Sequence, residues 1–262
     1  MPDVPLLRNR YGFNSDGHTA VRENLIRLAN DIATSGEERE VLVGLNLGKN
    51  KFSPESSVDD YTQGLKIFAD NDVIDYFVIN ISSPNTPGLR KLQQADQLKQ
   101  LLTAIASVKR EENLKKPILL KISPDLSASD REQVCNLIMT ANNKQQTIDG
   151  IIVSNTTTWR PENSQEELIC EVGGLSGAPL RTLSTQAITH VYAVTKGTLP
   201  IVGVGGIFNG EDAFEKIRAG ASLIQIYTSL ALDGPPVVPA IGRELAALLR
   251  LVRLSTFMIG YH

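Results

Sequence analysis

The residues with the clearest chemical potential lie in the stretch Asn80–Arg90, which reads NISSPNTPGLR. It follows an apolar run at 76–79 and precedes a periodic helix, so it is predicted at the carboxyl end of a strand. Asn80 and Asn85 can each donate and accept hydrogen bonds, which suits a flat polar ligand with imide and carboxylate edges. Ser83 is a candidate base or nucleophile. The alternative is a Ser/Asn/Pro turn that only caps the next helix.

Polar or glycine residues also end the other strands predicted from the sequence. Six apolar runs, typical of strands, alternate with helical patterns, and they cover 41–46, 76–79, 117–122, 150–155, 199–204 and 222–227. Strict alternation predicts parallel strands, and therefore one α/β domain over residues 1–262. The strand ends carry Asn46, Asn80 with Ser83, Lys121, Ser154 with Asn155 and Thr156, Gly205 with Gly206, and Tyr227 with Thr228. In a barrel these residues converge on one face.

Lys121 and the glycine run 203–206 allow more than one interpretation. Lys121 lies in an otherwise apolar strand, where it could extend to solvent, pair with a carboxylate, or act as a Schiff-base amine of lowered pKa. The run Gly203-Val204-Gly205-Gly206 lets backbone N–H groups approach a ligand closely. The helix that follows offers its N-terminus to an anion, so the run predicts a phosphate site. A tight turn is the alternative.

The remaining segments are predicted as follows. Residues 6–18 are irregular, and a helix with Val21, Leu25 and Ile32 on one face ends at Gly36. The run at 41–46 is apolar enough to be buried on both faces. Ser129 and Glu132 form a capping box for the helix that carries Cys135. A loop covers roughly 157–180, and a final helix covers about 238–250.

Composition indicates a globular protein and gives no sign of a disulfide-rich, metal-binding or membrane-spanning one. The chain has 262 residues, of which 42% are apolar and 21% charged, as in globular proteins. A net charge of −3 gives no reason to expect a nucleic-acid partner. Cys135 and Cys170 are too few for a disulfide framework, and His18, His190 and His262 are too scattered for a metal site. No membrane-length apolar run and no targeting signal is visible.

The stretch at 80–90 resembles the active-site loop of the dihydroorotate dehydrogenases. The segment NRYGF at 9–13 and the segment GGLSG ending at Gly177 are also similar to this family, and the resemblance covers roughly residues 8–250. At the position of Ser83 the membrane-linked, quinone-using class has its catalytic serine base, whereas the soluble class has cysteine. Ser83 therefore implies the quinone-using class.

The resemblance implies a (β/α)₈ barrel that holds FMN and oxidises dihydroorotate to orotate in de novo pyrimidine (UMP) biosynthesis. In that reaction Ser83 takes the proton from C5 and hydride passes from C6 to the flavin, which a quinone then reoxidises. The implied substrate contacts are Asn9, Arg10, Tyr11, Gly12, Phe13, Asn80, Asn85, Asn155 and Thr156. The implied flavin contacts are Asn9, Asn46, Asn80, Lys121, Ser154, Gly177, Gly206, Tyr227 and Thr228.

The chain also departs from the family pattern. Six βα units are present where the barrel has eight, and residues 251–262 do not match the usual family ending. We therefore expect an incomplete barrel whose isolated form has little or no activity. By resemblance, and assuming a eukaryotic source, the full-length family works at the mitochondrial inner membrane. The rivals are a truncated non-catalytic product and another phosphate-binding barrel enzyme that uses Lys121.

Overall fold

The computed structural model describes residues 4–36, 39, 41–86, 88–161 and 172–259, with side chains described up to residue 251. It confirms the predicted alternation of strands and helices. Six strands form one sheet in the order β2-β3-β4-β5-β7-β8, which is consistent with part of a (β/α)₈ barrel. Their bounds are Gly44–Leu47, Tyr76–Asn80, Ile118–Ile122, Gly150–Val153, Ile201–Val204 and Leu223–Gln225.

The chain divides into two compact units. The first unit comprises Tyr11–Ile122 with Leu126–Ile151, and the second comprises Met1–Arg10, Ser123–Asp125 and Ile152–His262. The boundary passes through β5, whose first two residues belong to the first unit and whose last two belong to the second.

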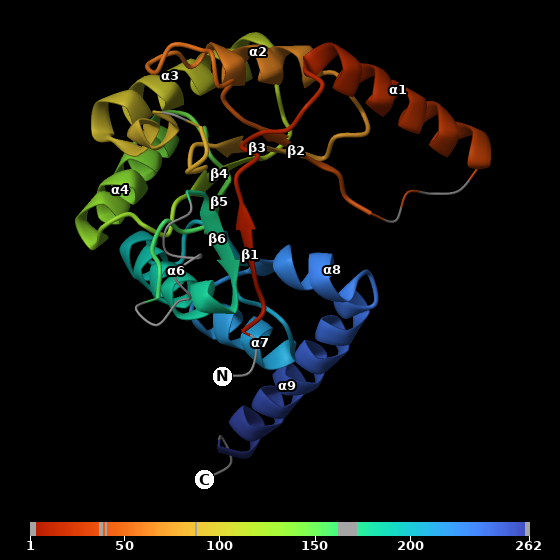
Figure 1. Cartoon of the computed structure of the whole chain (residues 1–262), viewed down its shortest axis with the longest axis vertical. Helices are drawn as coiled ribbons and strands as arrows, with labels where there is room; N and C mark the ends of the chain where they lie inside the picture. The colour runs from red at the N-terminus through yellow and green to blue at the C-terminus, as the bar shows by residue number, and fades with distance from the viewer. Residues whose placement is uncertain (1–3, 37–38, 40, 87, 162–171, 260–262) are drawn as a thin grey trace. The chain divides into compact units, whose positions relative to one another are not determined.

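In the first unit, β2, β3 and β4 pair in parallel, with Asn80 opposite Lys121. Figure 1 shows α2, α3 and α4 on the outer side of these strands. The helices are α1 His18–Ser35, α2 Asp59–Phe68, η1 Leu89–Gln93, α3 Ala95–Glu111 and α4 Ala128–Lys144. Tyr61, Phe68 and Phe77 are fully buried between helices and strands, which gives this unit a core of its own.

In the second unit, β7 and β8 pair in parallel, and a separate ribbon pairs β1 with β6 in antiparallel fashion (Figure 1). Helix α9 packs against α7 through a core that includes Ala213 and Ile241. The other elements are β1 Leu6–Asn9, β6 Gly174–Gly177, η2 Ala178–Leu180, α6 Arg181–Thr195, α7 Gly210–Arg218, α8 Thr228–Asp233 and α9 Val237–Ile259.

The ribbon corrects two predictions, because residues 6–9 were expected to be irregular and residues 174–177 to be loop. Each strand has only four residues, which is too short to show a period of two, and one of them contains two glycines. The strands exist because they pair with each other across most of the chain length. A long-range pairing of this kind leaves no local sequence signal.

Two further predictions are corrected at β2 and at α4. The run 41–46 is not buried on both faces, since Val41 and Leu42 are 73% and 77% exposed. The reason is that β2 is the first strand in the sheet order and has one strand neighbour. Helix α4 is capped by Ser127, whose Oγ accepts a hydrogen bond of 3.1 Å from the amide of Asp130. The predicted pair Ser129 and Glu132 lies two residues too late.

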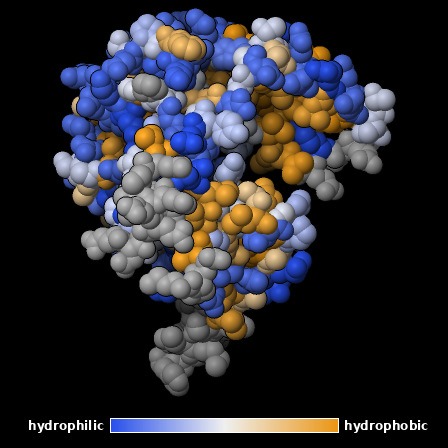
Figure 2. Space-filling model, viewed as in Figure 1, coloured by the Kyte–Doolittle hydropathy of each residue, from blue (hydrophilic) through white to orange (hydrophobic). Residues whose placement is uncertain are grey.

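The predicted end of α1 is confirmed, because Gly36 follows the helix with a φ of 67°. No residue of α1 is buried, and Figure 2 shows hydrophobic surface on the lower side of this helix. The apolar stripe predicted for the helix is therefore only partly covered in the first unit. No described helix has the length and apolar content needed to cross a membrane.

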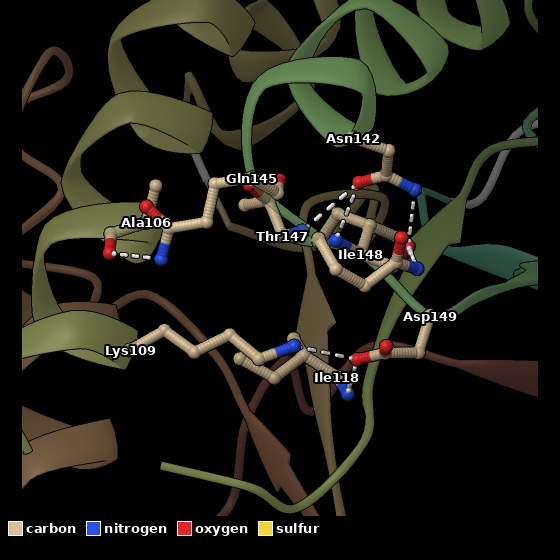
Figure 3. A network of polar contacts seen from close by, with 9 residues as sticks. Ala106, Lys109, Ile118, Asn142, Gln145, Thr147, Ile148 and Asp149 are labelled. Carbon is tan, nitrogen blue, oxygen red and sulfur yellow. Dashed lines mark hydrogen bonds and ion pairs between the residues drawn. The ribbon is translucent and has the colours of Figure 1, made fainter. Parts of the chain in front are cut away.

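A polar network fastens the amino end of β5 inside the first unit (Figure 3). The Oδ1 atom of Asn142 accepts from the amides of Thr147 and Ile148 at 3.0 Å each, and its Nδ2 donates to the Ile148 carbonyl. Asp149 Oδ2 accepts from the Lys109 ammonium and from the Ile118 amide, both at 2.9 Å. The network connects α4, α3 and β4 to the residues that lead into β5.

Replacing Asn142 with alanine tests how much this network stabilises the protein. Thr147 and Ile148 are buried, so the variant leaves two backbone amides without their partner, whereas the Ile148 carbonyl keeps the bond from Gln146 Nε2 at 3.2 Å. We expect Asn142→Ala to lower the free energy of unfolding by about 2–4 kcal/mol in urea denaturation. Asn136→Ala, at an exposed position of the same helix, is the matched control and should cost less than about 0.5 kcal/mol. Equal losses in both variants would contradict this account.

Candidate functional site

The residues predicted to do chemistry fall into two groups, one in each unit. The first unit holds Tyr11, Gly12, Phe13, Asn46, Asn80, Ser83, Asn85 and Lys121. The second unit holds Asn9, Arg10, Ser154, Asn155, Thr156, Gly177, Gly206, Tyr227 and Thr228.

Asn80 is the centre of the first group. It ends β3, is 6% exposed, and its Nδ2 donates to Asn46 Oδ1 at 3.2 Å. Its Oδ1 accepts from the Ser82 hydroxyl at 2.9 Å and from the Ser82 amide at 3.3 Å. The donor and acceptor ends of the Asn80 amide are therefore both used, which fixes the orientation of the side chain.

Tyr61 of α2 supports Asn80 by a hydrogen bond to its backbone. It is fully buried on α2, and its hydroxyl donates to the backbone carbonyl of Asn80 at 3.0 Å. Burial raises the pKa of the Tyr61 phenol, so the group stays protonated and keeps this bond. Helical spacing alone could not separate this role from simple packing.

Ser83 is held in a tight local turn. The side chain is 7% exposed, and its Oγ accepts a hydrogen bond of 3.3 Å from the amide of Asn85. The carbonyl of Ser82 accepts a hydrogen bond from Arg90 Nε at 3.1 Å. Arg90, the last residue of the motif, thus stabilises the backbone near its start. A hydroxyl that accepts from a backbone amide can still donate its own hydrogen to another group.

The segment predicted at 11–13 lies against the same region of the first unit. A Cβ atom added at Gly12 would lie 3.6 Å from the Thr86 hydroxyl, and φ at Gly12 is 72°. A Cβ atom at Gly48 would lie 2.6 Å from the ring of Phe13. Tyr11 is 84% exposed. Gly12 and Phe13 are therefore packed close to the loops that follow β3 and β2.

Lys121 lies opposite Asn80 in the pairing of β3 with β4. Burial lowers the pKa of its ammonium group from 10.5 to about 8. The group therefore carries its charge at neutral pH, but holds the proton less tightly than a lysine in water. An amine of this kind suits electrostatic stabilisation of a negative charge, and it is also easier to deprotonate for nucleophilic attack.

The lowered pKa of Lys121 predicts how stability depends on pH. Between pH 8 and pH 10.5 the unfolded chain binds the proton that the folded chain has lost, so Lys121 makes stability rise with pH in this window. Relative to Lys121→Met, the wild type should gain roughly 2–3 kcal/mol in free energy of unfolding between pH 7 and pH 10. Lys66, an exposed lysine whose pKa its partner Glu111 raises, supplies the control Lys66→Met. A parallel pH dependence of wild type and Lys121→Met would contradict the assignment.

In the second group, the residues after β5 are fixed by a carboxylate that was not singled out from the sequence. Asp125 accepts from the Thr157 hydroxyl, from the Thr158 amide at 2.8 Å and from the Thr158 hydroxyl at 2.9 Å. Thr157 in turn exchanges two backbone hydrogen bonds with Leu175 of β6. Asn155 and Thr156 therefore lie in a loop that is fastened immediately after them.

The signal for Asp125 was present in its position, because Ser123-Pro124-Asp125 follows the strand 117–122 directly. The partners of the carboxylate could not be found from the sequence, since they lie 32 and 33 residues away. Ser154, which precedes the loop, is 1% exposed, and its amide donates to the Val204 carbonyl of β7 at 3.1 Å.

Glycines form a narrow backbone cradle in the second unit. The φ angles are 92° at Gly177, 127° at Gly205 and 70° at Gly206, which favour glycine over any other residue. A Cβ atom at Gly177 would lie 2.4 Å from the Pro5 carbonyl oxygen, and one at Gly206 would lie 2.6 Å from Arg181 Cα. The backbone segments thus approach each other too closely for a side chain at either position.

Two residues that follow β8 carry buried hydroxyl groups, and one of them bonds to Ser176, the residue before Gly177. Thr228 is buried, and its hydroxyl donates to the Ser176 hydroxyl at 2.9 Å. Ser229 is 1% exposed, and its Oγ is one of the few buried side-chain atoms of the described residues that have no hydrogen-bond partner. Tyr227 is 62% exposed. A buried hydroxyl without a partner is costly and suits a ligand oxygen.

The described residues contain no cluster of three or more His, Cys, Asp or Glu side chains that could hold a metal ion. Cys135 is buried on α4, and burial raises the pKa of its thiol to about 11. Cys170 lies outside the described residues.

Comparisons with known proteins agree on one family. The family described as "Dihydroorotate dehydrogenase" matches residues 3–249. A mouse protein named dihydroorotate dehydrogenase (quinone), mitochondrial, is 46% identical over 95% of this chain and 62% of its own length. A Synechococcus protein named dihydroorotate dehydrogenase (quinone) is 42% identical over 94% of this chain and 64% of its own length. The chain thus spans about three fifths of these relatives.

A solved structure shows the same relationship in three dimensions. The dihydroorotate dehydrogenase of Eimeria tenella, crystallised in complex with ferulenol, superposes with a TM-score of 0.86 at 35% identity. The match covers 95% of this chain and 69% of that one.

Proposed function

The chain belongs to the dihydroorotate dehydrogenase family, and from this premise we propose that its residues carry FMN-dependent oxidation of dihydroorotate to orotate, with a quinone as the electron acceptor. This reaction belongs to de novo pyrimidine (UMP) biosynthesis. The observation that carries the proposal is the group around Asn80, where described residues of the family motif form a largely buried hydrogen-bond network.

In this proposal Ser83 accepts the proton from C5 of dihydroorotate. Its hydroxyl is nearly buried and is oriented by the amide of Asn85. Asn80 and Asn85 supply amide groups for the polar edges of the substrate, and the family resemblance assigns the same kind of contact to Asn155 and Thr156. The orientation of Asn80 is set in advance by Asn46, Ser82 and Tyr61, so substrate binding need not order it.

The glycine cradle and the hydroxyls after β8 fit the phosphate of FMN. Gly177 and Gly206 let backbone segments pack more closely than any Cβ atom would allow, and the buried Ser229 hydroxyl has no hydrogen-bond partner among the described residues. Bound FMN would supply the hydride acceptor for C6 of the substrate. Lys121, whose ammonium is charged at neutral pH, would stabilise negative charge on the reduced ring. Asn9, Asn46, Ser154, Tyr227 and Thr228 complete the proposed flavin contacts.

The quinone acceptor and the cellular location rest on the relatives. The mouse and Synechococcus proteins both carry the word quinone in their names, and the mouse protein is described as mitochondrial. We extend both properties to this chain, with Ser83 as the residue that agrees with the quinone-using class. Membrane association at the mitochondrial inner membrane is part of this proposal.

Ser83→Ala tests the proposed proton acceptor. In single-turnover stopped-flow experiments with FMN-loaded protein, the variant should reduce its flavin about 100-fold or more slowly with dihydroorotate than the wild type does. FMN should remain bound, because Ser83 is assigned to the substrate and not to the flavin. Ser129→Ala, an exposed serine of α4, is the control and should react at the wild-type rate. A normal rate of flavin reduction in Ser83→Ala would defeat the assignment.

A second candidate is a non-catalytic product of such a gene, and the exposed sheet ends favour it. Leu223 in β8 is 65% exposed, and Val41 and Leu42 just before β2 are more exposed still. Open strand edges with apolar side chains invite mispairing between molecules. An aggregated and colourless protein on gel filtration would support this candidate over the proposed enzyme.

A further inference from the structure

The glycine cradle of the second unit is fastened by one arginine. Arg181 is the first residue of α6, four residues after Gly177, and its Nε donates to the carbonyl of Gly206 at 2.9 Å. The backbone of Gly206 also approaches Arg181 so closely that a Cβ atom there would lie 2.6 Å from Arg181 Cα. Arg181 therefore joins the loop after β6 to the loop after β7.

Helix α7 holds this arginine through two residues that are four positions apart. Asp212 pairs with the guanidinium at 2.8 Å from Nε and 3.0 Å from Nη2. The ammonium of Lys216 donates to the backbone carbonyl of Arg181 at 2.7 Å and to the hydroxyl of Thr185 at 2.5 Å. Because residues i and i+4 share one face of a helix, a single face of α7 secures both the side chain and the backbone of Arg181.

Asp212 also fixes the far side of the glycine loop. Its Oδ2 accepts from the amide of Phe208 at 2.9 Å, and its own amide donates to Asn209 Oδ1, which caps α7. The loop between β7 and α7 is thus held at Gly206 by Arg181 and at Phe208 by Asp212. Asp212 and Lys216 are buried, so neither is an ordinary surface charge.

The cluster combines charges of both signs. Arg181 and Lys216 are cationic, Asp212 is anionic, and Glu215 adds a second carboxylate that acts on Lys216. Burial lowers the pKa of Lys216 to about 8, so the group is still mostly protonated at neutral pH. Each cation donates to a backbone carbonyl, Arg181 to that of Gly206 and Lys216 to that of Arg181.

We propose that Arg181 and Asp212 are a pair of positioning residues that preset the loop at Gly205 and Gly206 for the phosphate group of the flavin. This inference rests on the proposed function, since the ligand is FMN. The two side chains need not touch the phosphate. They hold the backbone that does, so that its amides are in place before the ligand arrives.

The test compares FMN with riboflavin, which has the same ring system but lacks the phosphate. By fluorescence titration of the full chain, Arg181→Gln should weaken FMN binding about 10- to 100-fold and leave riboflavin affinity unchanged. Asp212→Asn should act in the same direction. Arg218→Gln removes an equal charge from the end of α7, where Arg218 lies over the Phe214 ring, and should leave both affinities unchanged.

Two results would overturn the inference. Equal losses for FMN and riboflavin would show that Arg181 only stabilises the unit, and an unchanged FMN affinity would show that the loop does not depend on the pair. A wild-type chain that binds neither compound would instead contradict the proposed function.

Hydrogen exchange of the unliganded chain keeps the inference testable even in that case. The loop amides at 205–209 should exchange several-fold faster in Arg181→Gln than in wild type or Arg218→Gln. Unchanged exchange would contradict the presetting of the loop.

Discussion

The parallel pairing of β3 with β4 is the constraint on which the first unit depends. It sets Asn80, the last residue of β3, beside Lys121, the last but one of β4, next to a largely apolar core. Polar groups in such a place must be satisfied, and Asn46, Ser82 and Tyr61 satisfy Asn80. The same bonds that remove the cost of burial also fix the geometry of the proposed substrate contacts.

In the second unit the main constraint is the close approach of backbone segments, and not the burial of polar side chains. Gly177 and Gly206, both with positive φ, bring backbone segments within distances that no Cβ atom allows, and the ion pair of Arg181 with Asp212 holds one of these loops. Glycine adopts these angles without the steric cost that a Cβ atom would bring, so the choice of residue permits the close approach. In both units, groups outside the motif hold the motif in place: Tyr61 in the first, and Asp125, Arg181 and Asp212 in the second.

The sequence predicted the alternating fold, because strand ends, glycines and helix periodicity are local signals. It failed where long-range contacts decide. The ribbon of β1 and β6 depends on pairing between residues 6–9 and 174–177, and the exposure of the residues before β2 depends on its place at the end of the sheet. Asp125 and Arg181 can be read from the sequence, but their roles in holding loops depend on hydrogen-bond partners that are distant in the chain. Ser83 remains a prediction of role, since the family motif and not its geometry assigns it.

The most direct test of the central claim is the visible spectrum of the FMN-reconstituted chain after gel filtration, recorded before and after anaerobic addition of dihydroorotate. The proposed function, in contrast to the expectation that the isolated incomplete barrel has little or no activity, predicts a monomeric peak that carries about one FMN per chain, and loss of the oxidised-flavin absorbance when dihydroorotate is added. A chain that loses its FMN on the column, or that binds FMN and leaves it oxidised in the presence of dihydroorotate, would contradict the claim that these residues perform the reaction.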